Sequence, residues 1–304
     1  MILFAQQNKL NLECTDYTGN YLGMKQPGIT PQKFAPDFIS MANQFDQCLV
    51  FSPDGNQLVY VWADSVWQHY GMIYAKRTSG KWTRKNILQY KSSDKVPFNP
   101  TFSGDSKEII FGMAVNGWPD TDIYTLGLYD SAYDSIPVRM NTPINTPMLD
   151  FDYFIDKDST IYFTGKRDDF VGGTFDVYMC KKVNGHYVTT NLWVLNSILD
   201  DAAPYISPDG SYLVYEQMVN DKKLPYNDST ARIIKVELFV SFRDKMNNWS
   251  KPINLGPSVN PKASRTYRPV ISSDGKFLFY TQRNDKGADI YWVSTKLIEK
   301  LRPK

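Results

Sequence analysis

The residues best suited to chemistry are carboxylates, which recur along the chain in pairs and in repeated turns. The candidates for an acid and a base set across a glycosidic bond are Asp150 with Asp152, Asp168 with Asp169, and Glu216. Sequence does not give the separation of such pairs, and Asp-rich loops are equally typical of solvated turns. We therefore predict no catalytic set and keep a carbohydrate-active hydrolase or lyase as the alternative function.

The sequence has few residues that could support metal or redox chemistry. Two histidines, His69 and His186, are too few for a multi-histidine metal site or a His-dependent lyase centre. Cys14, Cys48 and Cys180 lack the spacing of a disulfide framework or a Cys-x-x-Cys site, so we expect buried small hydrophobic side chains. The prediction is no metal and no cofactor.

Charge and hydropathy limit the partners. The formal net charge is +2, from 34 basic and 32 acidic side chains, which gives no long-range field to attract nucleic acid. No apolar run is long enough for a transmembrane segment. Partners must be recognised by local contacts, and we expect a monomer.

The first residues differ in character from the rest. Residues 1–7, Met-Ile-Leu-Phe-Ala-Gln-Gln, read like the end of a signal peptide with cleavage after Ala5, although a basic region before the apolar stretch is missing. An ordinary frayed terminus is the alternative. We assign residues 1–9 to this segment and residues 10–304 to one domain.

An internal repeat organises that domain. Five copies of one segment centre near residues 54, 105, 157, 209 and 274. The first copy is Phe-Ser-Pro-Asp-Gly-Asn-Gln-Leu-Val-Tyr at residues 51–60, and residues 52, 103, 155, 207 and 272 are aligned as equivalents, with spacings of 51, 52, 52 and 65. In the third copy Lys157 and Asp158 replace the Asp-Gly pair.

Each copy predicts a β-hairpin. Gly supplies positive φ in a tight turn, Pro presets the first corner, and Asp bonds to the turn backbone. The repeated aspartates are therefore predicted to cap turns and not to catalyse; they are Asp54, Asp105, Asp209 and Asp274.

A third strand follows each hairpin, with Asp-Ile-Tyr in two copies and similar residues in the other three, and a short fourth segment follows in most copies. Four short antiparallel strands per 50 or so residues are typical of a propeller blade, so the prediction is an all-β β-propeller. The last copy lacks a full fourth strand, which the segment around residues 33–40 could supply, closing the ring. We prefer five blades, with six if residues 10–45 form an atypical blade.

Taken together, the Ser-Pro-Asp-Gly hairpins and Asp-Ile-Tyr strands resemble the repeats of TolB-like, WD-repeat-like β-propellers over roughly residues 30–300. The stretches 21–36 and 289–299 resemble a secreted or periplasmic group common in Bacteroidetes-type bacteria. The resemblance implies an extracytoplasmic location, in the periplasm or at the surface of a Gram-negative cell. It implies no reaction, because a fold does not fix function. The separate α/β domain that precedes the propeller of TolB has no counterpart in the first 40 residues, which puts inheritance of TolB's envelope role in doubt.

The predicted site lies on the face opposite the Asp-Gly turns, where loops join the second and third strands and where functional residues concentrate. Aromatic rings and charged groups of these loops are the predicted ligand-binding residues: Trp67, His69, Tyr70, Trp118, Lys166, Arg167, Asp168, Glu216 and Arg283. For each one, packing between blades or solvation is the alternative.

The predicted function is non-enzymatic binding of an envelope protein or a glycan through this loop-rich face. The fourth copy carries about ten extra residues in its loop, near 216–236, which could form a lid or an inert insertion.

Overall fold

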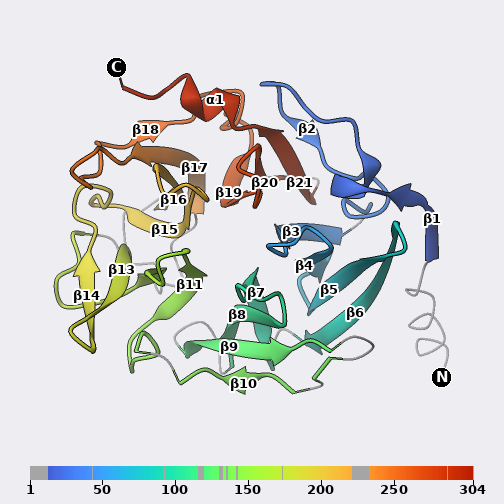
Figure 1. The fold of residues 1–304 in the computed structure, drawn as a ribbon, viewed down its shortest axis with the longest axis horizontal. Coiled ribbons are helices and arrows are strands. Elements are labelled where there is room, and N and C mark those ends of the chain that lie inside the picture. The colour runs from blue at the N-terminus through green and yellow to red at the C-terminus, as the bar shows by residue number, and fades with distance from the viewer. Residues whose placement is uncertain are drawn as a thin grey trace.

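The computed structural model describes residues 13–42, 44–91, 94–115, 120–129, 133–134, 136–141, 143–172, 174–220, 233–285 and 287–303. Over these ranges the fold is all-β apart from one turn of α1 (Lys296–Glu299) and the short η3 (Asn20–Gly23). Figure 1 shows the strands arranged around a central axis, and the innermost strands are β3 (Gln44–Phe51), β7 (Val96–Phe102), β11 (Asp150–Ile155), β15 (Asp200–Ile206) and β19 (Arg265–Ile271). The prediction of an all-β β-propeller is confirmed.

Three sheets are four-stranded and antiparallel, and each comes from one copy of the repeat. The first holds β7 (Val96–Phe102), β8 (Glu108–Ala114), β9 (Thr121–Gly127) and β10 (Val138–Arg139). The second holds β11 (Asp150–Ile155), β12 (Ile161–Gly165), β13 (Asp176–Val183) and β14 (His186–Asn191). The third holds β15 (Asp200–Ile206), β16 (Tyr212–Asn220), β17 (Ile233–Phe242) and β18 (Ile253–Asn254).

The remaining strands form one nine-stranded sheet with two antiparallel groups. One group is β3 (Gln44–Phe51), β4 (Gln57–Asp64), β5 (His69–Thr78) and β6 (Lys81–Lys91), extended by β1 (Glu13–Thr18). The other is β19 (Arg265–Ile271), β20 (Phe277–Asn284), β21 (Gly287–Ser294) and β2 (Gln32–Lys33). A single parallel pair, Phe45 opposite Ala288, joins the groups.

The segment before the first hairpin therefore does pair with the last strands, through β2 and through the bond from the Phe34 N–H to the Ile290 carbonyl just after it. Beyond β2 the chain turns, and it buries Phe34, Phe38 and Ile39 in a core that includes Trp292 and Phe279. The described part of residues 10–45 adds one strand to each group of the nine-stranded sheet and makes no sheet of its own.

The Asp-Gly turns are capped as their sequence predicts. In the turn after β3, Asp54 accepts hydrogen bonds from the Ser52 hydroxyl and from the backbone N–H of Asn56, and these bonds lower its pKa against a burial effect. The same pattern recurs at the other three aspartates, Asp105, Asp209 and Asp274.

The third hairpin is offset by one residue from the sequence alignment. Asp156, not Ile155, donates its backbone N–H to the residue that closes the turn, Thr160, as Ser52 does to Gln57. Its carboxylate also receives the N–H groups of Asp158 and Thr160, so an acidic side chain takes over the role of the serine. This turn is one residue shorter, which is why aligning Ile155 with Ser52 gave a wrong equivalence.

A second repeated feature escaped the sequence analysis. Every innermost strand carries a β-bulge, where two residues face one on the neighbouring strand, and its first residue has positive φ. These residues are Cys48, Asn99, Asp152, Ala203 and Arg268, with φ of 59°, 48°, 58°, 51° and 58°. None is glycine, so the residue type that most readily adopts positive φ did not mark them.

Side chains from the adjacent group of strands hold several of these bulges. The backbone N–H of Cys48 bonds to Thr281 Oγ1, that of Ala203 to Thr164 Oγ1, and that of Arg268 to Glu216 Oε2. The acceptors lie on β20, β12 and β16, each directly after a buried aromatic residue. The bulges therefore tie adjacent groups of strands together: the two groups of the nine-stranded sheet at Cys48, and separate sheets at Ala203 and Arg268.

Candidate functional site

A cavity of about 450 Å³ lies at the end of the axis where second and third strands are joined, the loop-rich face. We call it the axial pocket. Its lining comes from every sheet: Gln47, Cys48, Trp67, Tyr70, Val96, Pro97, Phe98, Asn99, Thr121, Leu149, Phe151, Phe175, Glu216, Met218, Val236, Arg265, Tyr267, Arg268 and Arg283. Its volume falls within the range of small-molecule sites.

The floor of the axial pocket is a charged cluster centred on Arg268. Its Nη1 lies 2.9 Å from Asp152 Oδ1 and 3.5 Å from Glu216 Oε1. Both carboxylates are almost fully buried, with side-chain exposures of 3% and 1%. The bulge at Arg268 brings its guanidinium between two carboxylates that come from the sheets of β11 and β16.

The remaining carboxylate oxygens of this cluster are also engaged. Asp152 Oδ2 accepts the Thr164 hydroxyl and the backbone N–H of Ala203, while Glu216 Oε2 accepts the backbone N–H of Arg268. Burial raises the pKa of Glu216, and the Arg268 charge opposes this shift. The arrangement suits a structural tie better than an acid and base pair, because an arginine occupies the space between the carboxylates.

Uncharged polar groups complete the floor. The Cys48 thiol bonds to Asn99 Oδ1 at 3.3 Å, and the Tyr267 hydroxyl donates to Gln47 Oε1. Burial raises the pKa of Cys48 to about 12, so the thiol is protonated and a poor nucleophile at neutral pH. Cys48 and Cys180 are both free and buried, as predicted from their spacing.

Aromatic and cationic side chains form one wall. Trp67, in the turn between β4 and β5, packs on Phe45 with ring centroids 4.3 Å apart and near Tyr70 at 5.7 Å. The Arg283 guanidinium lies 4.5 Å from the Trp67 ring and 5.2 Å from Phe45. Four residues predicted for the site thus share the pocket: Trp67, Tyr70, Glu216 and Arg283.

Other predicted residues lie elsewhere. His69 does not line the pocket; its Nδ1 lies 2.8 Å from Asp64 Oδ2 within the same turn. Lys166 stacks on Phe170, and Asp168 is exposed. Trp118 and residues 221–232 of the long loop lie outside the described residues, so the lid and the inert insertion both stay predictions.

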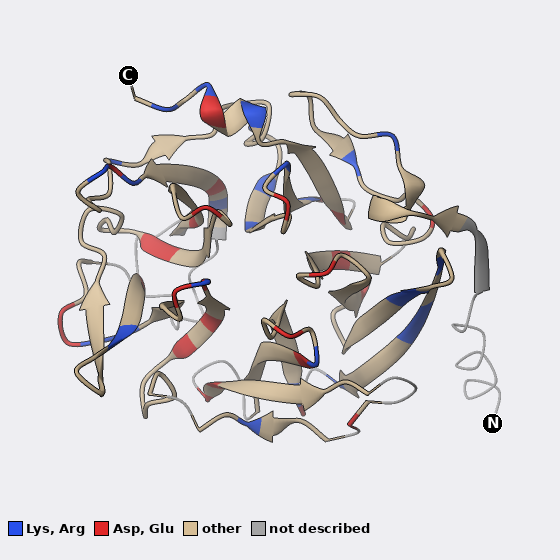
Figure 2. Ribbon diagram, viewed as in Figure 1, with Lys and Arg blue, Asp and Glu red and all other residues tan. Residues whose placement is uncertain are grey.

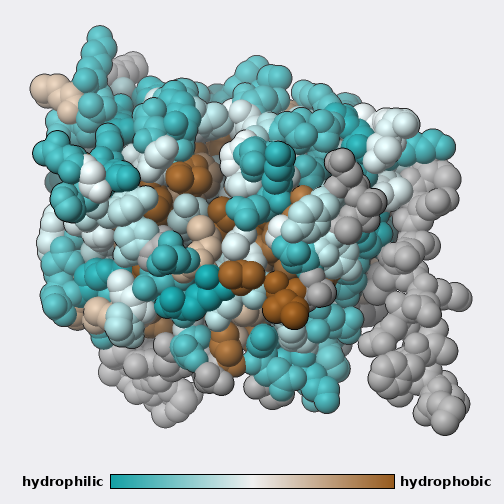
Figure 3. Space-filling model, turned by 60° about the horizontal axis from the view of Figure 1, so that its bottom comes forward, coloured by the Kyte–Doolittle hydropathy of each residue, from teal (hydrophilic) through white to brown (hydrophobic). Residues whose placement is uncertain are grey.

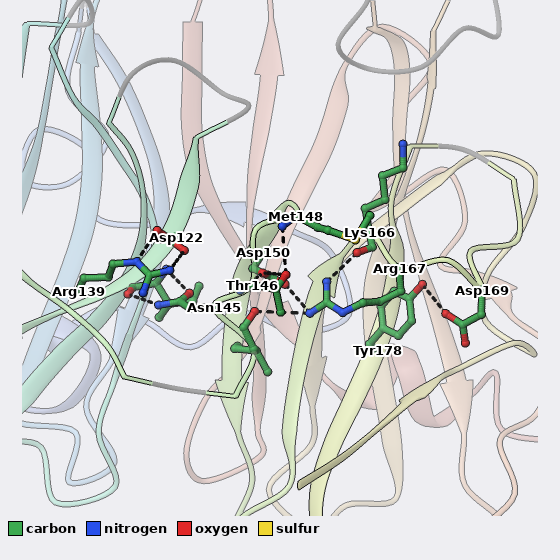
Figure 4. Close-up of polar contacts among 12 residues, drawn as sticks. Asp122, Arg139, Asn145, Thr146, Met148, Asp150, Lys166, Arg167, Asp169 and Tyr178 are labelled. Atoms are coloured by element: carbon green, nitrogen blue, oxygen red, sulfur yellow. Dashed lines mark hydrogen bonds and ion pairs between the residues drawn. The ribbon is translucent and has the colours of Figure 1, made fainter.

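Arg167 has a structural environment that explains why it is absent from the pocket. Its Nη2 donates to buried Asp150 at 2.6 Å and its Nη1 donates to the Lys166 carbonyl (Figure 4). The guanidinium also lies over the rings of Phe163 and Tyr178. Asp150 in turn accepts the backbone N–H and hydroxyl of Thr146. The pair holds the connection between two sheets, and both of its members are engaged by protein contacts.

Sequence reasoning missed the innermost strands, which supply Gln47, Asn99, Arg265, Tyr267 and Arg268. A usable signal existed. Four of the bulge residues lie four positions before the serine of their hairpin. Comparing the residues at this position among the repeat copies would have identified Arg268 as a candidate site residue. This position was not considered, because the alternation of hydrophobic residues along the strand does not reveal the bulge that exposes Arg268.

The opposite end of the axis holds a second hollow of about 870 Å³, lined by the Asp-Gly turns and by residues such as Phe102, Phe154 and Ile206. Figure 2 shows the acidic turns close to the axis, and Figure 3 shows apolar surface inside a hollow ringed by hydrophilic residues. A narrow space of about 40 Å³, lined by the five bulge residues, lies at the level of Arg268.

No protein-family model matches the sequence, and no curated protein matches it. Solved structures similar in fold include TolB from Acinetobacter baumannii, at 16% identity over 81% of this chain and 53% of that chain, with a TM-score of 0.46. An α-L-arabinanase from Penicillium chrysogenum, complexed with arabinobiose, shares 10% identity over 88% of this chain and 98% of its own, with a TM-score of 0.44.

A periplasmic gluconolactonase from Pseudomonas aeruginosa is also similar, at 12% identity over 79% of this chain and 65% of its own, with a TM-score of 0.41. This chain spans about half the length of the A. baumannii TolB. Likeness at this level says nothing about activity, so the function is argued from the pocket. No described helix is long and apolar enough to cross a membrane.

Proposed function

We propose that this chain is an extracytoplasmic five-bladed propeller that binds a partner protein segment or a glycan in the axial pocket, without converting it. Support for a closed ring comes from contacts between its first and last strands: the Cys48 bond to Thr281, the pair Phe45 and Ala288, and the β2–β21 ladder. The location rests on the resemblance to TolB-like repeats and on residues 1–5. Recovery in the periplasmic or surface fraction of cells expressing the full gene tests it.

The observation that carries the binding proposal is the composition of the axial pocket. Trp67, Tyr70 and Arg283 form one wall on rigid strands and a short turn, and apolar side chains form the other. Aromatic rings beside guanidinium groups are the residues that dominate recognition surfaces. The nearby carboxylates Asp152 and Glu216 are held by Arg268, so among the described residues no acid and base pair faces the space.

Binding can be tested by screening the full chain against a glycan array and an envelope-protein peptide library, and by following Trp fluorescence. We expect a ligand whose affinity falls by about 10-fold or more in Trp67→Ala, as for an interface anchor. Val66→Ala, in the same turn and 64% exposed, is the matched control and should leave affinity unchanged. Binding that ignores Trp67 would contradict a site in this pocket.

A carboxylate-dependent hydrolase or lyase is the second candidate, favoured by one observation: Asp152 and Glu216 lie on the same Arg268 nitrogen. Turnover of any glycan that disappears in Glu216→Gln and in Asp152→Asn, with binding retained, would establish catalysis and overturn the non-enzymatic proposal. Binding without turnover in a hydrolysis screen would support it.

A further inference from the structure

Two arginines in the axial pocket lie directly opposite each other. Arg265 of β19 and Arg283 of β20 are direct partners in an antiparallel pair, and both line the cavity. Like charges at directly opposed positions repel. Burial lowers the pKa of Arg265, and the Arg283 charge lowers it further. Such a pair is costly in the empty protein.

Nearby groups do not neutralise this pair. Across the described part of the chain, neither guanidinium forms an ion pair with a carboxylate. Asp285 and Tyr267 raise the pKa of Arg265, but each has a smaller effect than Arg283, which lowers it. Glu216, the acidic residue in the pocket lining, is bound by Arg268.

The contacts of Arg283 leave it ready to bind. Its planar face stacks near Trp67 and Phe45. A guanidinium held by its face keeps its N–H groups in the plane, where they can form a paired set of hydrogen bonds with a carboxylate. The aromatic residues therefore orient the donor without using it.

The wall away from the arginines has the opposite character. This apolar part of the lining is the cluster of Phe98, Phe151, Phe175, Met218 and Val236, of which the three phenylalanines lie on, or directly before, strands of sheets other than that of the arginines. These side chains offer no hydrogen bonds beyond the weak Met sulfur. A sugar ring carries many hydroxyl groups that lose hydrogen bonds to water when buried against such a surface. The apolar part of a ligand has no such hydrogen bonds to lose when it is buried there.

We propose that the axial pocket binds an organic carboxylate, with its acid group on Arg265 and Arg283 and an apolar body on the Phe98, Phe151 and Phe175 side. The inference rests on the proposed function and narrows its ligand. The same chemistry is offered by the C-terminus of a partner peptide with apolar last residues and by a free aryl carboxylate.

The charge requirement is tested first on the unaltered full chain, by calorimetric titration with 2-naphthoate and its neutral amide. We expect the carboxylate to bind about 10-fold or more tightly, the ratio given by a charge-assisted pair of hydrogen bonds, with affinity falling as salt rises. Equal affinity for acid and amide would overturn the inference but leave binding in the pocket standing.

Variants then locate the acid group. Arg265→Gln and Arg283→Gln should each remove most of the preference for the carboxylate, whereas Arg139→Gln, an exposed arginine on β10, should not. If Arg283→Gln folds poorly, Arg265→Gln and Arg265→Lys still decide, because Lys keeps the charge but not the paired geometry. A preference that survives both Arg265 variants would contradict the assignment.

Two further experiments are needed. One distinguishes a peptide C-terminus from a free aryl carboxylate as the ligand, and the other distinguishes the carboxylate inference from the proposed function. A peptide ending in Leu-Phe is compared as free acid and as C-terminal amide; tighter binding of the free acid than of 2-naphthoate favours a protein C-terminus. Binding of neutral glycans with no response to either acid would overturn the carboxylate inference and keep the proposed function. No binding by acids, peptides or glycans would overturn both.

Discussion

At the scale of single residues, Arg268 is the cation of the buried charged cluster near the axis. It lies between Asp152 and Glu216, whose burial is acceptable only because a cation and several donors face them. We predict that Arg268→Met lowers the free energy of unfolding by about 3–5 kcal/mol, since it leaves buried charge uncompensated. Chemical denaturation measures this.

An exposed arginine and a double-mutant cycle provide controls for that prediction. Arg139→Met breaks an ion pair in which the arginine is 49% exposed, and should cost less than about 1 kcal/mol. In a double-mutant cycle, Glu216→Gln should reduce the cost of Arg268→Met, because one buried charge is already gone. Purely additive costs would show that the two side chains do not interact.

A second residue-scale prediction concerns pH. Burial raises the pKa of Asp201 to about 7, although Gln217 and Ser197 donate hydrogen bonds to it. A raised acid pKa means that the folded chain holds a proton that the unfolded chain releases, so this contribution is complete below about pH 4 and is lost as pH rises through about 7. Urea unfolding at pH 5 and pH 8 should give a smaller difference for Asp201→Asn than for the parent. An unchanged difference would show that Asp201 ionises normally.

At the scale of elements, the turns allow a reciprocal test. Gly210 has φ of 75° with open space around its missing Cβ, while Ser106 occupies the same turn position with φ of 60°. A left-handed conformation costs a residue with a Cβ about 1 kcal/mol. Gly210→Ser should therefore destabilise the protein, and Ser106→Gly should stabilise it by a similar amount in thermal unfolding. Changes of the same sign would contradict this explanation.

The same elements show what the sequence could and could not predict. Hairpins were predictable because Ser-Pro-Asp-Gly encodes its turn within four residues, and the wall residues Trp67 and Arg283 followed from their loops. The bulges were not, because Cys48, Ala203 and Arg268 adopt positive φ where side chains distant in sequence accept their backbone N–H groups. Arg167 was misplaced for a related reason: its partner Asp150 is 17 residues away, and only the folded sheet brings them together.

At the scale of the whole molecule, Phe34 connects the beginning and the end of the chain. It is fully buried, with its ring centroid 5.1 Å from those of Phe279 and Trp292 and 6.0 Å from that of Phe51. These partners belong to the two groups of strands that the proposed ring closure joins. A change at Phe34 should therefore act on both groups.

Phe34→Ala should lower the free energy of unfolding by about 3–5 kcal/mol, the usual cost of truncating a buried phenylalanine. Hydrogen exchange should speed up in β3–β6 and in β19–β21 together, since both lose the same contact. Phe163→Ala is the matched control, because Phe163 is equally buried and packs on Tyr178 of its own sheet and in a cluster with Ile110 and Ile123 of the β7–β10 sheet. Its faster exchange should therefore start in β7–β14 and leave β3–β6 and β19–β21 unchanged. If Phe34→Ala loosens only one of the two groups, the first and last strands are not coupled, and the closed ring is wrong.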